Sequence, residues 1–562
     1  MEKDEGRVTA REENNDETLR HLNQQDDDSK ATPAGTNKGD AEDETVQQTG
    51  TQDSNPFKKR LMRSSSVKVN VTELLDVNMG YLVAYVACYS LSVWHTTWAL
   101  AGNSQTTTVF EVKFEWSEDD TILYNSIIST AGIIGLTIGS FLGGSLLGLG
   151  RRKAVMIGQL SGIVGALICM FGTVATLSIG RLFVGVAAGV SNVTFGKSIG
   201  ENILEKYSES AAMMLNASIC IGLFFCYLMG EILPDPEDIQ ANRDDELWRV
   251  IYIVPAIVGI IVILLVLLIF RDEPVTYCIM NDLEEEGKRH MARVYRKKDL
   301  TDAQTIDELI ESQFSFQRQS TTLDASSTTF KEAVCGRKYR KASWICFIIN
   351  CFNQQSGINA INVYANRLLV KMQEGGGEFP LTPRQGTYVI GAVNGLAALL
   401  AIWTITLQGR RPIFIQGQFF MAVWLFLCGL SVLEQWNMTA FISINLFITS
   451  FQLSQGSTAW LYVPEVCVDS GTGLAVAAQF LNLTLISFTF EFMMNSSLEV
   501  HGSIWYFAVL TAIGCLFMIC FVRETRGLTD LEKKTLYSPK NVEIEDIMEM
   551  TAVANNKSEE TK

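Results

Sequence analysis

The sequence predicts an all-α polytopic membrane protein, with twelve transmembrane helices in two six-helix bundles. Three observations lead to this prediction. Of the 562 residues, 48% are hydrophobic. Apolar runs of about 20 residues recur, which is the length that a helix needs to cross the ~30 Å hydrocarbon core of a bilayer. Features of the first half of the chain also return in the second half.

Twelve such apolar runs follow one another along the chain. Their approximate bounds are 80–102, 123–149, 153–173, 176–198, 210–232, 249–270, 342–365, 386–407, 412–433, 439–464, 470–494 and 503–522. The runs predict one bundle at 77–270 and a second at 342–535. Between them, residues 271–341 form a polar linker with short amphipathic patterns.

The acidic charge is concentrated at the two ends of the chain. The formal net charge is −16, and residues 1–76 and 536–562 are polar with few apolar residues. Such segments cannot bury enough apolar surface to fold. We expect both to be disordered tails.

The two predicted bundles repeat each other. Gly150-Arg151-Arg152 recurs as Gly409-Arg410-Arg411, and Glu201 has a counterpart in Glu465, so that both offsets are close to 260 positions. Parallel six-span repeats are typical of transporters that rock two bundles around a central site.

Lysine and arginine set the expected orientation. They gather after the second, sixth and eighth runs, whereas the connections after the first and fifth runs are acidic. The positive-inside rule therefore places both termini in the cytosol. Two sequons, at Asn437 and Asn495, then lie outside, which is compatible with glycosylation and a plasma-membrane location.

The residues show no catalytic constellation, metal-ligand cluster or phosphate-binding loop. There are four histidines, and the Gly-Lys-Ser at 196–198 lacks the upstream glycine of a P-loop. We expect no enzyme activity, no cofactor, no metal and no nucleic-acid partner.

Uncharged amides inside the apolar runs carry the functional signal. They include five within FNQQSGINAINVY, from Phe352 to Tyr364. Outside that stretch, the notable polar or amphipathic residues are Asn216, Asn394, Gln452, Trp460 and Asn482. Amides in hydrocarbon need partners, and interhelical hydrogen bonds stabilise membrane helices by only about 0.6 kcal/mol each. Either structural bonding or a wet cavity for a neutral polyhydroxylated solute explains them, and the chemistry favours the cavity.

Helical spacing suggests how part of such a site is built. Gln452, Gly456 and Trp460 are four residues apart and share one face of a regular helix. Trp460 would offer an apolar surface to a sugar ring. Among ionisable residues, His95 lies in the middle of the first run and could carry a proton, with Arg181 a second candidate.

Several motifs then resemble the sugar porter family of the major facilitator superfamily, over roughly residues 80–535. Gln354 to Asn359 resembles the QQxSGIN signature of the seventh helix, with Asn353 and Gln354 in the places of the paired glutamines. Arg523 to Gly527 resembles the PETKG end signature. Further matches are Gly180-Arg181 with Glu201, Asn216, Asn394, Trp460 and Pro464-Glu465.

The resemblance implies the major facilitator fold and transport of a hexose or polyol by alternating access. It implies a substrate site lined by Asn216, Asn353, Gln354, Asn359, Asn394 and Trp460, to which we add Gln452, an amide that stands where related transporters often have Glu. It also implies a conformational latch of Arg151, Arg152, Glu201, Arg410, Arg411 and Glu465.

Several charges of the family's latch are absent from this chain. The replacements are Leu147, Gly148, Ser208, Thr276, Thr406 and Thr472. Paired charges at one face bias a conformational equilibrium, so we expect a weakened latch and a larger inward-facing population.

Three functions remain open from the sequence. Facilitated diffusion is favoured, because Trp94-His95-Thr96-Thr97 lacks the carboxylate of proton-coupled relatives. The alternatives are proton symport through His95, or a sugar sensor or structural membrane subunit without transport. The expected partners are a sugar or polyol and the lipid bilayer, and the expected state is a monomer.

Overall fold

The computed structural model describes residues 75–202, 205–297, 306–324, 330–374, 380–528 and 530–539. The predicted disordered tails therefore lie almost wholly outside the described residues. At their inner edges the predicted bounds are wrong. Residues 75–77 form a strand, and Tyr537 is buried, with its hydroxyl 2.8 Å from that of Tyr462.

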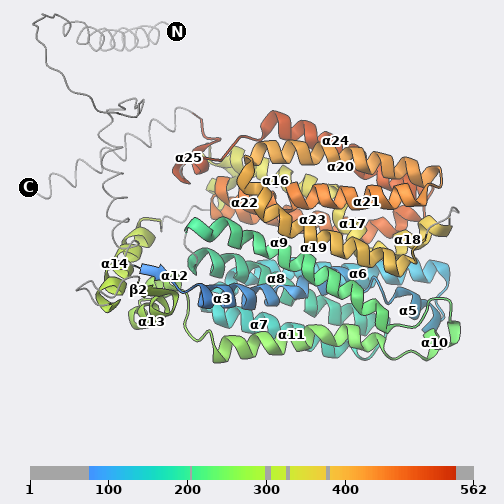
Figure 1. The fold of residues 1–562 in the computed structure, drawn as a ribbon, viewed down its shortest axis with the longest axis horizontal. Helices are drawn as coiled ribbons and strands as arrows, with labels where there is room; N and C mark the ends of the chain where they lie inside the picture. Colours follow the sequence, from blue (N-terminus) through green and yellow to red (C-terminus); the bar gives the residue numbers. More distant parts are fainter. Residues whose placement is uncertain are drawn as a thin grey trace, which may run out of the picture. The chain divides into compact units, whose positions relative to one another are not determined.

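The first bundle runs from α3 to α11 (Figure 1). Its elements are α3 (Met79–Ser92), α4 (Trp94–Ala101), α5 (Thr107–Lys113), α6 (Glu118–Leu146), η1 (Leu147–Leu149), α7 (Arg151–Cys169), α8 (Val174–Asn202), α9 (Glu205–Leu228), η2 (Met229–Ile232), α10 (Ile239–Asp244) and α11 (Trp248–Leu268).

The linker and the second bundle follow. The linker holds α12 (Val275–Met280), α13 (Glu284–Val294), β2 (Tyr295–Lys297), α14 (Ile306–Asp324) and α15 (Phe330–Cys335). The second bundle holds α16 (Arg340–Gln355), α17 (Ile358–Val363), α18 (Ala365–Glu374), α19 (Pro383–Leu407), α20 (Arg410–Leu433), α21 (Asn437–Phe451), a π-helical segment (Gln452–Gly456), α22 (Ser457–Val466), α23 (Asp469–Met494) and α24 (Glu499–Phe521). Helix α25 (Asp530–Thr535) comes last.

Nine of the twelve predicted spans are helices long and apolar enough to cross a membrane, within the described ranges. The other three predicted spans, the first, seventh and tenth, are interrupted helices. The first breaks at Val93 between α3 and α4, and the seventh breaks at Gly357, whose φ is +83°. The tenth contains the π-helical segment. Irregular backbone at membrane depth is tolerated where it lines a cavity or is buried in protein.

A small sheet was not predicted. Strand β1 (Leu75–Val77) pairs antiparallel with β2, and Asn78 Nδ2 donates to Arg293 O at 3.1 Å just beyond it. The start of α3 is thereby attached to the linker. The all-α prediction holds for the bundles and misses this two-stranded element.

The bundles pack through glycines and meet along two helix pairs. On α6, a Cβ at Gly135 or Gly139 would collide with the backbone of α8 at Leu182 or Val186, so the glycines permit close helix approach. Between the bundles, α9 packs on α19 and α6 packs on α23. We call the end with Gly150 and Gly409 the basic end, and the opposite end, where α6 begins, the acidic end.

Candidate functional site

A chain of four buried amides joins the two bundles. Asn216 Nδ2 on α9 donates to Gln452 Oε1 at 2.8 Å. Gln452 Nε2 donates to Asn394 Oδ1 at 2.9 Å, and Asn394 Nδ2 donates to Asn362 Oδ1 at 3.3 Å. Each residue is at most 9% exposed. The first residue belongs to the first bundle and the other three to the second, so three predicted site residues and Asn362 form one bridge.

The chemistry of this amide chain suits a hydroxylated ligand. Each amide has both donors and an acceptor, and in a buried setting the groups must be satisfied by one another or by a ligand. Cys220, one turn from Asn216 on α9, also accepts from Gln452 Nε2 at 3.1 Å. The chain is polar and carries no formal charge, which matches a neutral solute.

A second amide set lies at the break of the seventh predicted span. Gln354 Nε2 donates to Asn353 Oδ1 at 3.1 Å, and Asn359 Nδ2 donates to Gln354 Oε1 at 2.8 Å. Asn353 and Gln354 are buried, while Asn359 is half-buried. The left-handed Gly357 between α16 and α17 brings Asn359 back towards Gln354. In a continuous helix these two residues, five positions apart, would not lie on the same face.

Gln355 is directed elsewhere. Its Nε2 donates to Asn482 Oδ1 on α23 at 3.0 Å, and its side chain is half-buried. The two neighbouring glutamines therefore differ in their partners, and Gln354 is the one joined to the other predicted site residues.

The π-helical segment changes the predicted geometry of the tenth span. Gln452, Gly456 and Trp460 were expected on one face of a regular helix, but the segment Gln452–Gly456 is π-helical, so the four-residue spacing does not apply across it. Instead, the Gln452 side chain lies over Gly456, where a Cβ would be 2.7 Å from Gln452 Oε1. Trp460 is half-buried and packs against apolar clusters from both bundles.

A cavity of about 480 Å³ lies between α3, α9 and α19, and none of the amide residues lines it. It runs along α3 and α9, from Met79 to Trp94 and Ile221, and Ile402 of α19 closes one side. Met79 and Val83, at its mouth, are 47% and 60% exposed. The volume is within the range of small-molecule sites.

The acidic end is closed by ion pairs between the bundles. Arg367 on α18 lies between Glu491 on α23 (3.2 Å) and Glu111 on α5 (3.3 Å). The Glu491 side chain is fully buried, and Asn125 Nδ2 on α6 donates to it at 3.4 Å. We call Arg367, Glu491, Glu111 and Asn125 the outer cluster. It contains charges of both signs and residues of both bundles.

Further contacts close the acidic end at the start of α19. Arg384 donates to the carbonyl oxygens of Leu233 and Pro234 at 2.9 and 2.8 Å. The Tyr388 hydroxyl donates to Glu231 at 2.6 Å. These bonds also cross from the second bundle to the first.

At the basic end the predicted latch residues pair inside their own bundles. Arg151 Nε donates to Glu201 at 2.8 Å, and Arg410 pairs with Glu465 at 3.0 Å. The backbone N–H groups of Arg151 and Arg152 also donate to Glu273.

In the second bundle, Glu524 takes the position that Glu273 has in the first. The backbone N–H groups of Arg410 and Arg411 donate to Glu524 at 2.9 and 3.1 Å. Burial raises the pKa of the Glu273 carboxyl, and the hydrogen bonds from Arg152 and Arg151 oppose that rise. The two halves thus repeat in structure as well as in sequence.

The two candidate proton sites lie apart from the amide chain. His95 is buried on α4, and its Nδ1 is 3.2 Å from Ser92 O. Arg181 donates to three backbone carbonyl oxygens, those of Ile128, Trp98 and Ala99.

The two sequons differ in exposure. Asn437, at the start of α21, is 3% exposed, and Asn495 is half-buried at the end of α23. In a eukaryotic secretory pathway we expect Asn495→Gln to remove any endoglycosidase-sensitive shift in electrophoretic mobility, and Asn437→Gln to leave it. A shift that persists in the Asn495→Gln protein would contradict this expectation.

The predicted list of site residues left out three amides that support the site. Asn362 ends the amide chain, and Tyr227 OH on α9 donates to its carbonyl oxygen at 2.5 Å. Gln455 is fully buried and accepts from Asn353 Nδ2 through its backbone at 3.4 Å. Gln418 on α20 donates to the Gln455 side chain. All are amides within apolar runs, so the signal that singled out Asn394 applied to them as well.

Comparisons with known proteins identify the family of the chain. The family model described as "Sugar (and other) transporter" matches residues 80–537. The glucose transporter GlcP of Staphylococcus epidermidis is 28% identical over 71% of this chain and 86% of its own. Hexose transporter 1 of Plasmodium yoelii yoelii is 24% identical over 74% of this chain and 84% of its own.

Solved structures support the fold. The proton:xylose symporter XylE, bound to 6-bromo-6-deoxy-D-glucose, has a TM-score of 0.67 at 20% identity, covering 82% of this chain and all of that one. A partially occluded inward-open form of XylE from E. coli gives a TM-score of 0.65 at 21% identity, over 80% of this chain. The fold is that of the major facilitator superfamily, and the chain belongs to the sugar (and other) transporter family, whose members are transporters and not enzymes.

Proposed function

We propose that this transporter moves a neutral hexose or polyol by facilitated diffusion, through alternating access of the amide site to the two faces of the membrane. The observation that carries the proposal is the buried chain Asn216–Gln452–Asn394–Asn362. It bridges the two bundles with groups that donate and accept without charge. A sugar hydroxyl can replace either partner in such a bond.

The arrangement of the two ends supports an inward-facing state. The outer cluster and the contacts of Arg384 and Tyr388 hold the bundles together at the acidic end. A cavity along α3 and α9 includes the exposed residues Met79 and Val83 near the basic end, which the Lys/Arg pattern assigns to the cytosol. The pairing of Arg151 with Glu201 and of Arg410 with Glu465 inside each bundle agrees with a weakened latch.

Sugar recognition would use residues of both bundles. Asn216 would contribute from the first bundle, and Asn353, Gln354, Asn359, Asn394 and Gln452 from the second. Trp460 would supply an apolar surface beside them. Because the site touches both bundles, opening at either end can occur around a fixed ligand.

Uptake by purified protein in liposomes tests the proposal directly. Radiolabelled hexoses and polyols should enter down their gradients, and counterflow should occur with the preferred sugar. Binding without flux would identify a sensor, and neither binding nor flux across the panel would identify a structural subunit. Both results contradict the proposal.

Proton symport is the second candidate, because His95 is an ionisable side chain buried within the first span, and intramembrane ionisable residues commonly mark ion pathways. For a uniporter, a pH jump without a sugar gradient should drive no accumulation, and His95→Gln should leave equilibrium exchange within about twofold. Accumulation that follows the pH gradient and disappears in His95→Gln would instead establish symport through this residue. A plasma-membrane location and a monomeric state complete the proposal.

A further inference from the structure

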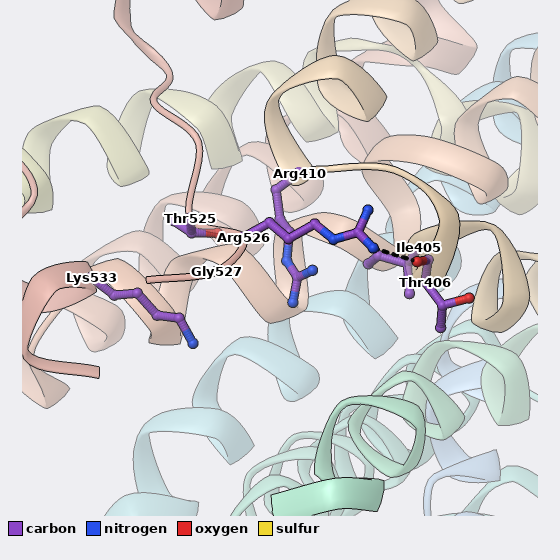
Figure 2. A pocket seen from close by; sticks show the side chains of 7 residues that line it. All are labelled: Ile405, Thr406, Arg410, Thr525, Arg526, Gly527 and Lys533. Carbon is purple, nitrogen blue, oxygen red and sulfur yellow. Dashed lines mark hydrogen bonds between the residues drawn. The ribbon is translucent and has the colours of Figure 1, made fainter. Parts of the chain in front are cut away.

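A second cavity, of about 230 Å³, lies at the basic end of the second bundle (Figure 2). It is bounded by the end of α19, the start of α20, the chain after α24 and helix α25. The lining residues are Ile405, Thr406, Arg410, Thr525, Arg526, Gly527 and Lys533. Three of these seven are cations and none is an acid.

The guanidinium of Arg526 is fixed by two hydrogen bonds and has further N–H donors. Its Nη1 and Nη2 donate to the carbonyl oxygens of Leu407 and Thr406, each at 3.0 Å; the dashed line in Figure 2 marks the bond to Thr406. A guanidinium has five N–H donors in one plane. The carbonyl bonds fix this plane and leave donors on it for a ligand.

The other two cations adjoin one carboxylate. Glu465 lies 3.0 Å from Arg410 Nη2 and 4.0 Å from Lys533 Nζ, and the Thr525 hydroxyl donates to it at 2.7 Å. The neighbouring acid Glu524 accepts from backbone N–H groups at the start of α20. Among the side chains that line the pocket, three are cations and none is an acid, so the lining itself is positively charged.

We propose that this pocket binds a phosphate-bearing anion from the cytosol or the cytosolic leaflet. A fixed arginine plane recognises two phosphate oxygens at once, and an ammonium adds a point charge. The volume is several times the ~30 Å³ share of a water molecule, so it can hold a phosphate and part of its substituent. The anion would compete with Glu465 for Arg410 and thereby act on a predicted latch residue. The site is separate from the sugar site.

The full-length protein in phosphatidylcholine nanodiscs provides the test. Glucose 6-phosphate and inorganic phosphate serve as soluble probes, and nanodiscs doped with phosphatidylinositol 4-phosphate serve as the lipid probe. Binding is measured by calorimetry for the soluble probes and by native mass spectrometry for the lipid. We expect at least one probe to bind, with a Kd at least tenfold weaker in Arg526→Gln and Lys533→Gln.

Two neighbouring cations serve as matched controls. Lys534 donates to Pro464 O and lies outside the lining, and Arg523 Nη1 donates to Leu536 O at 2.7 Å. Lys534→Gln and Arg523→Gln should change Kd by less than about twofold. Thermal unfolding of each variant checks its folding, and Arg526→Lys, which keeps the charge, should bind with intermediate affinity.

The binding experiment distinguishes four outcomes. Binding of the soluble probes assigns the pocket to a phosphate monoester, and binding of the doped lipid alone assigns it to a headgroup. An equal loss of affinity in all four Gln variants would show a diffuse basic surface and overturn the proposal. No binding of any probe at millimolar concentration would overturn it as well.

Discussion

Alanine at Gln354 or Asn359 is expected to lower sugar flux by at least about tenfold, whereas alanine at Gln355 is expected to keep it within about twofold. Gln354 joins Asn353 and Asn359 in one hydrogen-bonded set. Truncation of one member leaves another amide of the set without its partner, at a cost of about 1–3 kcal/mol. A free-energy change of about 1.4 kcal/mol corresponds to a factor of ten in an equilibrium constant. Gln355 bonds to Asn482 instead.

Gln355→Ala is the matched control, since it removes the same side chain one position away. Initial rates of uptake into liposomes, measured over a range of sugar concentrations, give kcat and KM for each variant. A rise in KM would indicate lost sugar contacts, and a fall in kcat alone would indicate a conformational role. Equal losses at Gln354, Asn359 and Gln355 would refute the assigned register.

Arg367→Met should shift the unliganded protein towards the outward-facing state by at least about a hundredfold. It leaves the buried carboxylate of Glu491 without its cation. Removing one partner of a buried ion pair costs about 3–5 kcal/mol, and opening the acidic end would relieve this cost by hydrating Glu491. Lost contact with Glu111 weakens the closed state further.

Spin labels can measure this shift. Cysteines at Gln240 and Ser496, both exposed at the acidic end in different bundles, report the separation of the bundles once the exposed Cys335 and Cys520 are replaced. Lys371→Met is the control, because its 3.8 Å pair with the 78%-exposed Glu118 is worth at most about 1 kcal/mol. An unchanged distance distribution in Arg367→Met would exclude the outer cluster as a closing element.

The sequence predicted the span pattern because hydrocarbon imposes a length and a composition on every crossing helix. It did not predict where three helices break. Gly357 is one glycine among 43, and its left-handed φ depends on the packing of α17. The π-helical segment contains no proline, so the sequence carries no local signal of an irregular helix there. The structure shows the irregularity together with the Gln452 side chain lying over Gly456.

The candidate site was predictable in its chemistry and less so in its connections. Asn216, Gln452 and Asn394 could be named because an amide inside an apolar run is expensive. Their joining across two bundles depends on how α9 and α19 pack, which no local pattern encodes. The outer cluster was not predicted, because Glu111 and Arg367 fall outside the apolar runs. Charged residues are common in such polar stretches and do not by themselves indicate a site.

The amide chain also bears on the kinetics of the empty carrier. A carrier that has released its cargo must return across the membrane without it, and unsatisfied amides would raise that barrier. Here Asn216, Gln452, Asn394 and Asn362 bond to one another, so these four side chains can supply each other's hydrogen-bond partners during that return. The bond from Asn216 to Gln452 crosses between the bundles, so it is a contact that the return step must break wherever α9 and the tenth span move apart.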